Sequence, residues 1–413
     1  MERLAPSAPS RAASQGLTHP MAAMLWHHDR FWPLGATQEI TMPGLLPDID
    51  PDGLLEYSVV YTDRSLNHMS QSFQQVMRDT SRTLKDVYRA ESAVIVPGSG
   101  TFGMESVARQ FATGKKTLVI RNGWFSYRWT QIFEMGDIPV ASTVMKAHRI
   151  GNGPQAPFAP APIDEVVTTI ETERPDLVFA PHVETASGML LPDDYLKQVA
   201  DAVHRVGGML VLDCIASGTL WMNMREIGVD VLISAPQKGW SGSPCCAMVM
   251  LSPLALERLE ATTSTSFAAD LRKWHEIMQA YENGGHAYHA TMPTDGLRRL
   301  RDIMQETADY GFDKVRDEQW ELGKRVRALL EERGFVSVAA EGFKAPGVVV
   351  SYTEDGAIAG KFMAAGLQVA TGVPLMCDEG DEYQAFRIGL FGLDKLHDVD
   401  GAVARLEQAL DRL

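Results

Sequence analysis

Residues 231–242 read VLISAPQKGWSG: an apolar, strand-like run, then small residues, then a lysine, Lys238. Upstream, residues 209–214 read MLVLDC, a second apolar run that ends in the carboxylate of Asp213. Loops that follow parallel strands are where α/β proteins place their functional groups. A lysine after a strand is usually only a solvated charge, so its role depends on what the other strand ends carry.

Short apolar runs alternate with helical patterns from about residue 90 to residue 255. The expected strands are 93–96, 117–121, 177–182, 209–213, 231–235 and 245–251. Helices are expected from about 102, from about 124 and over 193–206. This alternation predicts an α/β fold, with a mainly parallel sheet that helices cover on both faces.

The pattern changes after about residue 295. Apolar positions recur at helical spacing from there to about residue 334. Strands at 336–340, 348–352 and 386–390 and helices near 357–365 and from about 397 predict a small α+β unit. We therefore expect a disordered tail over 1–25, a large domain with an N-terminal segment over 26–295, and a small C-terminal domain over 296–413.

Composition excludes several classes of partner. The 413 residues suffice for one large and one smaller domain, and a net charge of −15 disfavours nucleic acid. No run approaches the roughly 18 apolar residues of a membrane span. The four cysteines lack zinc-finger spacing, and adjacent Cys245 and Cys246 in an apparent strand indicate buried thiols in a reducing, cytoplasmic setting. The first 20 residues are compatible with a transit peptide, but their prolines favour a plain tail.

Other strand ends carry groups that suit an anionic cofactor. Residues 97–101 read PGSGT between a strand and a helix, so Ser99, Gly100 and Thr101 can hold a phosphate, although such a turn alone is a weak signal. The Gln237 amide can reach a phosphate oxygen. A lysine and an aspartate on neighbouring strand ends suit pyridoxal 5′-phosphate, where lysine forms a Schiff base and aspartate keeps the pyridine nitrogen protonated.

Three further positions admit both a functional and a structural interpretation. Phe125 or Trp124, in the NGWF run at 122–125, could cover a cofactor ring or could be a core aromatic. Residues 182–188, HVETASG, could contact the cofactor or cap a helix. Arg387, inside an apolar strand, could clamp a substrate carboxylate or form an internal salt bridge.

From about residue 40 to its C-terminus the chain resembles the class V aminotransferases of fold type I, nearest to alanine–glyoxylate and serine–pyruvate aminotransferases and, more loosely, 2-aminoethylphosphonate transaminases. The likeness rests on seven motifs in the family's order. They are GSGTFGME (98–105), NG (122–123), ETASG (184–188), Asp213, QK (237–238), YHATMP (288–293) and RIG (387–389). The resemblance implies a seven-stranded, mainly parallel sheet in a large domain and a smaller α+β domain.

The resemblance also implies a role for individual residues. Ser99, Gly100, Thr101 and Gln237 would bind the phosphate; Phe125 would stack on the ring; Thr185 and Ala186 would lie near the ring oxygen; Asp213 and Lys238 would be catalytic. Tyr288 and Thr291 would reach the cofactor of a neighbouring subunit, which implies a homodimer with shared sites. Arg387 would bind the substrate carboxylate, and Gly44 would help shape the substrate pocket.

Two departures leave the substrate open. The family's Pro-Gly-Pro is Pro43-Gly44-Leu45 here, and Ala186 stands where relatives often have a hydroxyl. The run after Lys238 also differs from the family's Pro-Pro-Gly. The resemblance implies a small amino-acid donor and a 2-oxo acid acceptor such as glyoxylate or pyruvate, used in a ping-pong cycle.

Two rival functions share parts of this pattern, besides a 2-aminoethylphosphonate transaminase. A lyase of the cysteine desulfurase type would need a thiolate, and Cys377 is the candidate, but Asp378 and Glu379 beside it would raise its pKa. Desulfurases also commonly have His before the lysine, where this chain has Gln237. A sensing domain of a transcription regulator usually carries an N-terminal helix-turn-helix, for which the tail is too short and the chain too acidic.

Overall fold

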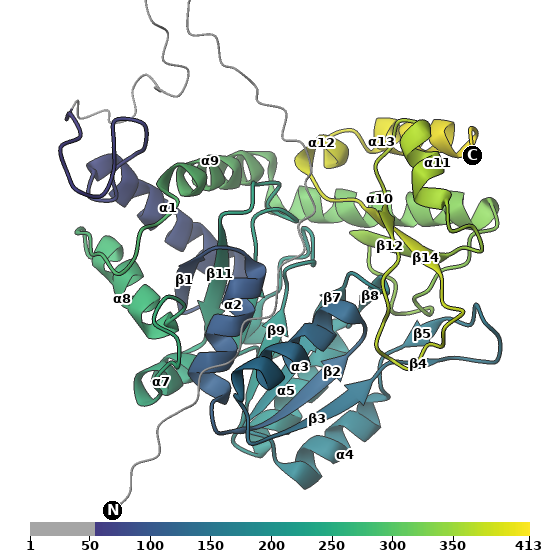
Figure 1. Ribbon diagram of the computed structural model, residues 1–413, viewed down its shortest axis with the longest axis horizontal. Helices are drawn as coiled ribbons and strands as arrows, with labels where there is room; N and C mark the ends of the chain where they lie inside the picture. Colours follow the sequence, from purple (N-terminus) through teal and green to yellow (C-terminus); the bar gives the residue numbers. More distant parts are fainter. Residues whose placement is uncertain (1–53) are drawn as a thin grey trace, which may run out of the picture. The chain divides into compact units, whose positions relative to one another are not determined.

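The computed structural model describes residues 54–413 and contains, within them, a central seven-stranded sheet (Figure 1). Its strands are β1 (Ser92–Pro97), β2 (Lys116–Arg121), β3 (Ala141–Lys146), β6 (Leu177–Pro181), β9 (Met209–Asp213), β10 (Val231–Ser234) and β11 (Cys246–Leu251). The order is β1-β11-β10-β9-β6-β2-β3, and only β11 runs antiparallel to its neighbours. The predicted mainly parallel sheet of seven strands is confirmed.

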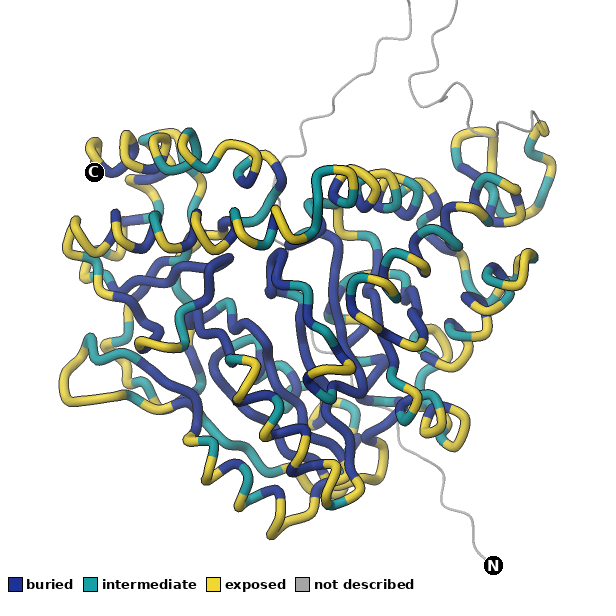
Figure 2. The backbone as a smooth tube through the Cα atoms, turned by 180° about the vertical axis from the view of Figure 1, so that it is seen from behind, coloured by how far each residue is buried: buried dark blue, intermediate teal, exposed yellow. Residues whose placement is uncertain are grey.

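The inner strands are buried, continuous runs that are apolar except at the ends of β9 and β10. Every residue of β6, β9, β10 and β11 is buried, and Figure 2 shows these strands as the dark centre of the molecule. Strands covered on both faces read as continuous apolar runs, which is how these segments could be recognised. The edge strand β3 (ASTVMK) is exposed or half-buried throughout.

Helices cover both faces of this sheet. Helix α3 (Trp124–Gly136) connects β2 to β3, toward one edge of the sheet. Helix α4 (Ile163–Glu173) connects β3 to β6, and α5 (Asp193–Arg205) connects β6 to β9, both toward the other edge. Because such crossovers are right-handed, α3 lies on one face and α4 with α5 on the opposite one, as Figure 1 shows. Helix α2 (Gly100–Val107), which continues as a π-helical turn over Ala108–Ala112, packs on β11. Helices α1 (Gln71–Tyr88), α7 (Pro253–Ala261) and α8 (Leu271–Glu282) were not predicted.

The C-terminal part contains a second, three-stranded antiparallel sheet in the order β12-β14-β13. Its strands are β12 (Val348–Tyr352), β13 (Ala370–Thr371) and β14 (Ala385–Gly389), with helices α10 (Phe312–Glu332), α11 (Ile358–Ala364), α12 (Leu393–Leu396) and α13 (Val399–Leu410). The expected long helical region is two helices, because Gly311, at φ 111°, separates α9 (Thr294–Tyr310) from α10.

One expected strand is absent. Residues 336–340 make isolated bridges to Phe158 and to Ser351 instead of a ladder, because their hydrogen bonds are divided between two different partners. The proposed division at residue 295 remains a prediction. The expected tail over 1–25 and the Gly44 loop lie outside the described residues. None of the helices in residues 54–413 combines the length and apolar composition that a membrane span requires.

Candidate active site

The functional strand ends meet at one edge of the large sheet. Asp213, the last residue of β9, is the register partner of Pro181 in β6 and of Ile233 in β10. Lys238 follows five residues after Ile233. Since β1, β2, β6, β9 and β10 point the same way, the segments after these strands gather at this edge.

The expected phosphate site lies at the start of α2. Ser99 is its N-cap residue, yet the Ser99 hydroxyl makes no capping hydrogen bond and stays available to a ligand. The N–H groups of a helix's first turn have no acceptor within the helix and point outward, which favours an anion. A side chain at Gly100 would force Ile215 to move. The Gln237 amide oxygen is buried without a partner among the described residues.

Asp213 is buried, and its carboxyl is a weaker acid than that of an exposed aspartate. Its Oδ1 accepts a hydrogen bond from the Ile215 N–H at 2.9 Å. Burial raises the pKa of Asp213 to about 7; this bond lowers it, the Glu184 charge raises it, and the Arg128 charge lowers it. A buried carboxylate of this kind gains from a cationic partner, which a protonated pyridine nitrogen would supply.

Lys238 is half-buried, and its surroundings favour the neutral form of its amine more than water does. Its Nζ lies 5.1 Å from the centre of the Phe391 ring. Burial, and then the nearby charge of Arg387, lowers the pKa of Lys238. A lysine must be unprotonated to act as a nucleophile or base, and desolvation beside another cation is a known way to achieve this.

Glu184 organises the site, a role that the sequence did not reveal. Its carboxylate is fully buried and accepts hydrogen bonds from Phe125 N (3.2 Å), Ser126 N (2.8 Å), Ser126 Oγ (2.7 Å) and Ala186 N (2.9 Å). A carboxylate at a helix N-terminus also interacts favourably with the helix dipole. Glu184 therefore fixes the first turn of α3 and, with it, Phe125. The available signal was an acidic residue three positions after the buried strand β6.

Two arginines approach the Phe125 ring. The guanidinium carbon of Arg128 lies 5.1 Å from the ring centre and that of Arg387 lies 5.8 Å from it. Arg387 Nε donates to the Thr371 carbonyl at 2.9 Å, and within residues 54–413 no carboxylate forms a salt bridge with Arg387. Burial lowers the pKa of Arg387, and Tyr383 and Glu184 raise it. The structural alternative for Arg387, an internal salt bridge, is therefore not seen in the described part of the chain.

The remaining predicted residues fall into two groups. Ala186 is fully buried and Thr185 is partly exposed, both directly after the Glu184 carboxylate. Tyr288 is 54% exposed, and its hydroxyl lies 2.9 Å from that of Thr291. No hydrogen bond joins Tyr288 or Thr291 to the strand-end residues within the described chain.

The site fits pyridoxal 5′-phosphate: a helix start suits the phosphate, an acid suits the ring nitrogen, and an amine suits the aldehyde. The sequence model of the family described as Aminotransferase class-V matches residues 54–357. The chain belongs to the class-V aminotransferases. It is therefore an enzyme whose cofactor is pyridoxal phosphate.

Similar proteins agree with this family. The class-V chain is 26% identical over 275 residues to an L-aspartate–glyoxylate aminotransferase of Paracoccus denitrificans, covering 65% of this chain and 66% of that protein. It is 27% identical over 356 residues to a 2-aminoethylphosphonate–pyruvate transaminase of Syntrophobacter fumaroxidans, and the match covers 85% of this chain and 90% of that protein. The solved structure of an alanine–glyoxylate aminotransferase of Nostoc sp. superposes with a TM-score of 0.70 at 22% identity. The superposition covers 83% of this chain and 88% of that one. That structural likeness supports the fold.

Cys377 is unsuited to desulfurase chemistry in this aminotransferase. Its thiol is buried and donates to the Arg121 carbonyl at 3.4 Å. Burial, followed by the charges of Glu184 and Glu379, raises the pKa of Cys377 to about 12. Asp378, expected to share this effect, instead pairs with Lys146 at 2.7 Å. A nucleophilic thiolate is therefore disfavoured.

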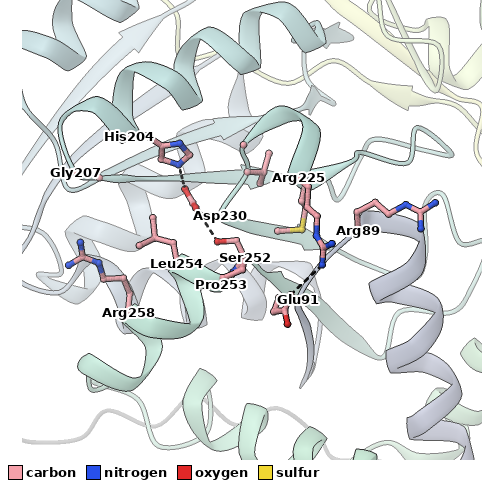
Figure 3. Close-up of a pocket in the computed structure, with 14 residues that line it drawn as sticks. Arg89, Glu91, His204, Gly207, Arg225, Asp230, Ser252, Pro253, Leu254 and Arg258 are labelled. Atoms are coloured by element: carbon pink, nitrogen blue, oxygen red, sulfur yellow. Dashed lines mark hydrogen bonds and ion pairs between the residues drawn. The ribbon is translucent and has the colours of Figure 1, made fainter.

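A separate hollow lies at the opposite edge of the sheet, where β9 and β10 begin (Figure 3). Asp230 bridges His204 Nε2 at 2.7 Å and Ser252 Oγ at 3.0 Å. The Asp230 hydrogen bond raises the pKa of His204 against the effect of burial. Figure 3 shows Arg89 and Arg258 at opposite sides of the hollow, so these charges do not converge on one ligand position.

Proposed function

We propose that this class-V aminotransferase transfers the amino group of a small amino acid to a 2-oxo acid, such as glyoxylate or pyruvate, with Lys238 and Asp213 as its catalytic residues. The observation that carries the proposal is the placement of Asp213 and Lys238 after the neighbouring parallel strands β9 and β10. Burial makes the Lys238 amine easier to deprotonate and the Asp213 carboxyl easier to protonate. Groups whose pKa values are displaced in this way are typical of catalytic sites.

The residues divide the work of the reaction. When bound, the cofactor supplies an electron-accepting ring that stabilises negative charge at the substrate's α-carbon. Asp213 holds a proton at the pyridine nitrogen. Lys238 would hold the cofactor at its aldehyde carbon and, as a general base, would move the proton of the substrate's α-carbon. Phe125 would cover one face of the ring, and Thr185 and Ala186 would lie near the ring oxygen. The phosphate would be bound by Ser99, Gly100, Thr101 and Gln237.

Arg387 is proposed to bind the substrate's acidic group. A guanidinium matches a carboxylate with two parallel hydrogen bonds, and Arg387 has only a backbone carbonyl as its hydrogen-bond partner in the described chain. The named relatives act with glyoxylate or pyruvate, which favours these acceptors. A phosphonate donor is the second candidate, because one relative uses 2-aminoethylphosphonate and the same arginine could bind that group.

A homodimer with shared sites and a cytoplasmic location complete the proposal. Tyr288 and Thr291 would reach the partner subunit's cofactor, and solvent-exposed aromatic side chains support an interface. Phe102 on α2 is 56% exposed, and Phe267, which contacts His289 beside Tyr288, is 78% exposed. The free cysteines of the described residues suit a reducing compartment.

The proposed activity is tested with a panel of amino donors against glyoxylate and pyruvate. Enzyme loaded with cofactor should release one oxo acid per site when a donor is added alone, and should retain the amino group until an acceptor arrives. Such stoichiometry distinguishes transamination from a lyase, which would turn over without an acceptor. Catalytic release of sulfide or of ammonia from a donor alone would contradict the proposal, as would a bound but unreactive cofactor, which marks a sensor.

A further inference from the structure

One cation at the site has no role so far. Arg128, on the second turn of α3, donates from Nη1 to the hydroxyl of Thr101 at 2.9 Å. Its guanidinium also lies over the Phe125 ring at 5.1 Å. Within residues 54–413, Arg128 forms no salt bridge with an Asp or Glu. It therefore brings to the start of α2 a positive charge that forms no ion pair with a carboxylate of the described residues.

The direction of the Thr101 contact matters. A guanidinium has only donors, so Thr101 Oγ must accept from Arg128, and its own O–H remains free to donate elsewhere. A hydroxyl that accepts from a cation is polarised and becomes a better donor toward an anion. The charge of Arg128 also acts on Asp213: it lowers the pKa of the Asp213 carboxyl, which burial raises. One side chain thus contacts the expected phosphate turn and the stacking aromatic, and acts on the acid of the ring nitrogen.

We propose that Arg128 is a positioning residue for the cofactor's phosphate: it orients the Thr101 hydroxyl toward the phosphate and supplies the positive charge that this dianion needs. The inference rests on the proposed site and extends it by one residue that the motifs did not indicate. Since Arg128 and Phe125 are three residues apart on α3, they share a face of the helix. The same side chain therefore ties the phosphate turn to the ring-stacking residue.

The test compares two cofactor forms that differ only in the phosphate. Dissociation constants of pyridoxal phosphate and of pyridoxal are measured by absorbance for wild type, Arg128→Gln and Arg128→Lys. Loss of a charge-assisted contact should weaken pyridoxal phosphate about ten- to a hundredfold in Arg128→Gln. Pyridoxal affinity should change less than about threefold. Arg128→Lys should fall between, because it keeps the charge and loses the planar fork.

Two controls make the result specific. Arg109→Gln removes an arginine that likewise donates to a threonine hydroxyl, Thr265 at 3.3 Å, but pairs with Glu105 and lies away from the strand ends; it should change neither constant. In a Thr101→Val background, Arg128→Gln should have a clearly smaller effect, because the two residues act together.

The outcomes separate the inference from the proposed site. Equal weakening of both cofactor forms would show a structural role and overturn the inference. Unchanged affinity for pyridoxal phosphate in Arg128→Gln would overturn it too, even if substrate binding suffered. A wild type that binds pyridoxal phosphate no better than pyridoxal would overturn both the phosphate site and the role of Arg128.

Discussion

At the scale of single residues, the buried carboxyl of Asp213 links function to a cost in stability. Its pKa is raised in the folded chain to about 7, well above its ordinary value of 3.8. For such a group, the stability that comes from the neutral form is present below pH 3.8 and is lost as the pH rises toward 7. The cofactor-free enzyme is therefore destabilised at neutral pH by a group that the proposed mechanism requires.

Asp213→Asn should stabilise the cofactor-free enzyme at pH 8 while abolishing turnover. The amide keeps the shape without the buried charge, so the gain in unfolding free energy should be on the order of 2–4 kcal/mol. At pH 4 the gain should nearly vanish, since the carboxyl is then protonated in the fold. Urea unfolding at both pH values measures this. A variant that is equally or less stable at pH 8 would refute the assigned cause.

Arg387→Lys should weaken acidic substrates and leave the cofactor bound. The charge persists but the two-pronged hydrogen bond is lost, at a cost of about 1.5–3 kcal/mol in kcat/KM. Arg333→Lys, which alters a surface arginine paired with Asp411, is the matched control. Release of the cofactor or unfolding in the Arg387 variant alone would make this residue structural.

The residues that could be predicted from the sequence are those whose signal is local. Lys238 and Asp213 each follow an apolar run, and that pattern places them at strand ends whatever the rest of the chain does. Glu184 and Arg128 could not be assigned this way, because their partners are brought to them by the fold. Glu184 is 59 residues from Phe125 in the chain, and Arg128 is 27 from Thr101.

At the scale of elements, the position of the phosphate turn depends on how closely α2 packs on β11. A methyl group at Gly103 would overlap Cβ of Ala247, a buried residue of β11 that is paired with strands on both sides. The helix can approach this strand only because the residue facing it has no side chain. Ser99 and Thr101 lie at the start of the same helix, so a shift of α2 away from β11 would move them as well.

Gly103→Ala should destabilise the enzyme and weaken cofactor binding. Alanine favours a helix by about 1 kcal/mol over glycine, but the displacement of α2 should cost about 1–3 kcal/mol, so the net effect is a loss. Gly360→Ala is the matched control: it lies in α11 with open space around it, so it should be neutral or slightly stabilising. Thermal unfolding and cofactor titration compare the two. If both variants behaved alike, close packing at Gly103 would have no consequence.

Elements were predictable where one periodicity dominated. The buried strands of the large sheet stand out as apolar runs, and the sequence placed six of its seven strands. The segment 336–340 also reads as a strand, yet it forms bridges to two partners and no ladder. The helical periodicity on both sides of Gly311 concealed the break between α9 and α10, which a backbone angle of φ 111° imposes.

At the scale of the whole molecule, the proposed homodimer would complete each site with Tyr288 and Thr291 of the partner chain. Mixing Lys238→Ala with a Tyr288→Phe/Thr291→Ala double variant should therefore restore activity after subunit exchange. In a symmetric dimer, half the dimers are mixed and each holds one intact site, so about a quarter of wild-type activity should return. Each variant incubated alone is the control. No recovery despite proven exchange, or an active monomer, would contradict shared sites.

The whole account depends on Lys238 as the residue that binds the cofactor covalently. The measurement is borohydride reduction of the enzyme carrying pyridoxal phosphate, followed by proteolysis and mass spectrometry of the labelled peptide. We expect a single phosphopyridoxyl label on Lys238, and no label in Lys238→Ala treated in the same way. A label on a different lysine, or none on a protein that has bound the cofactor, would contradict the assignment of the site.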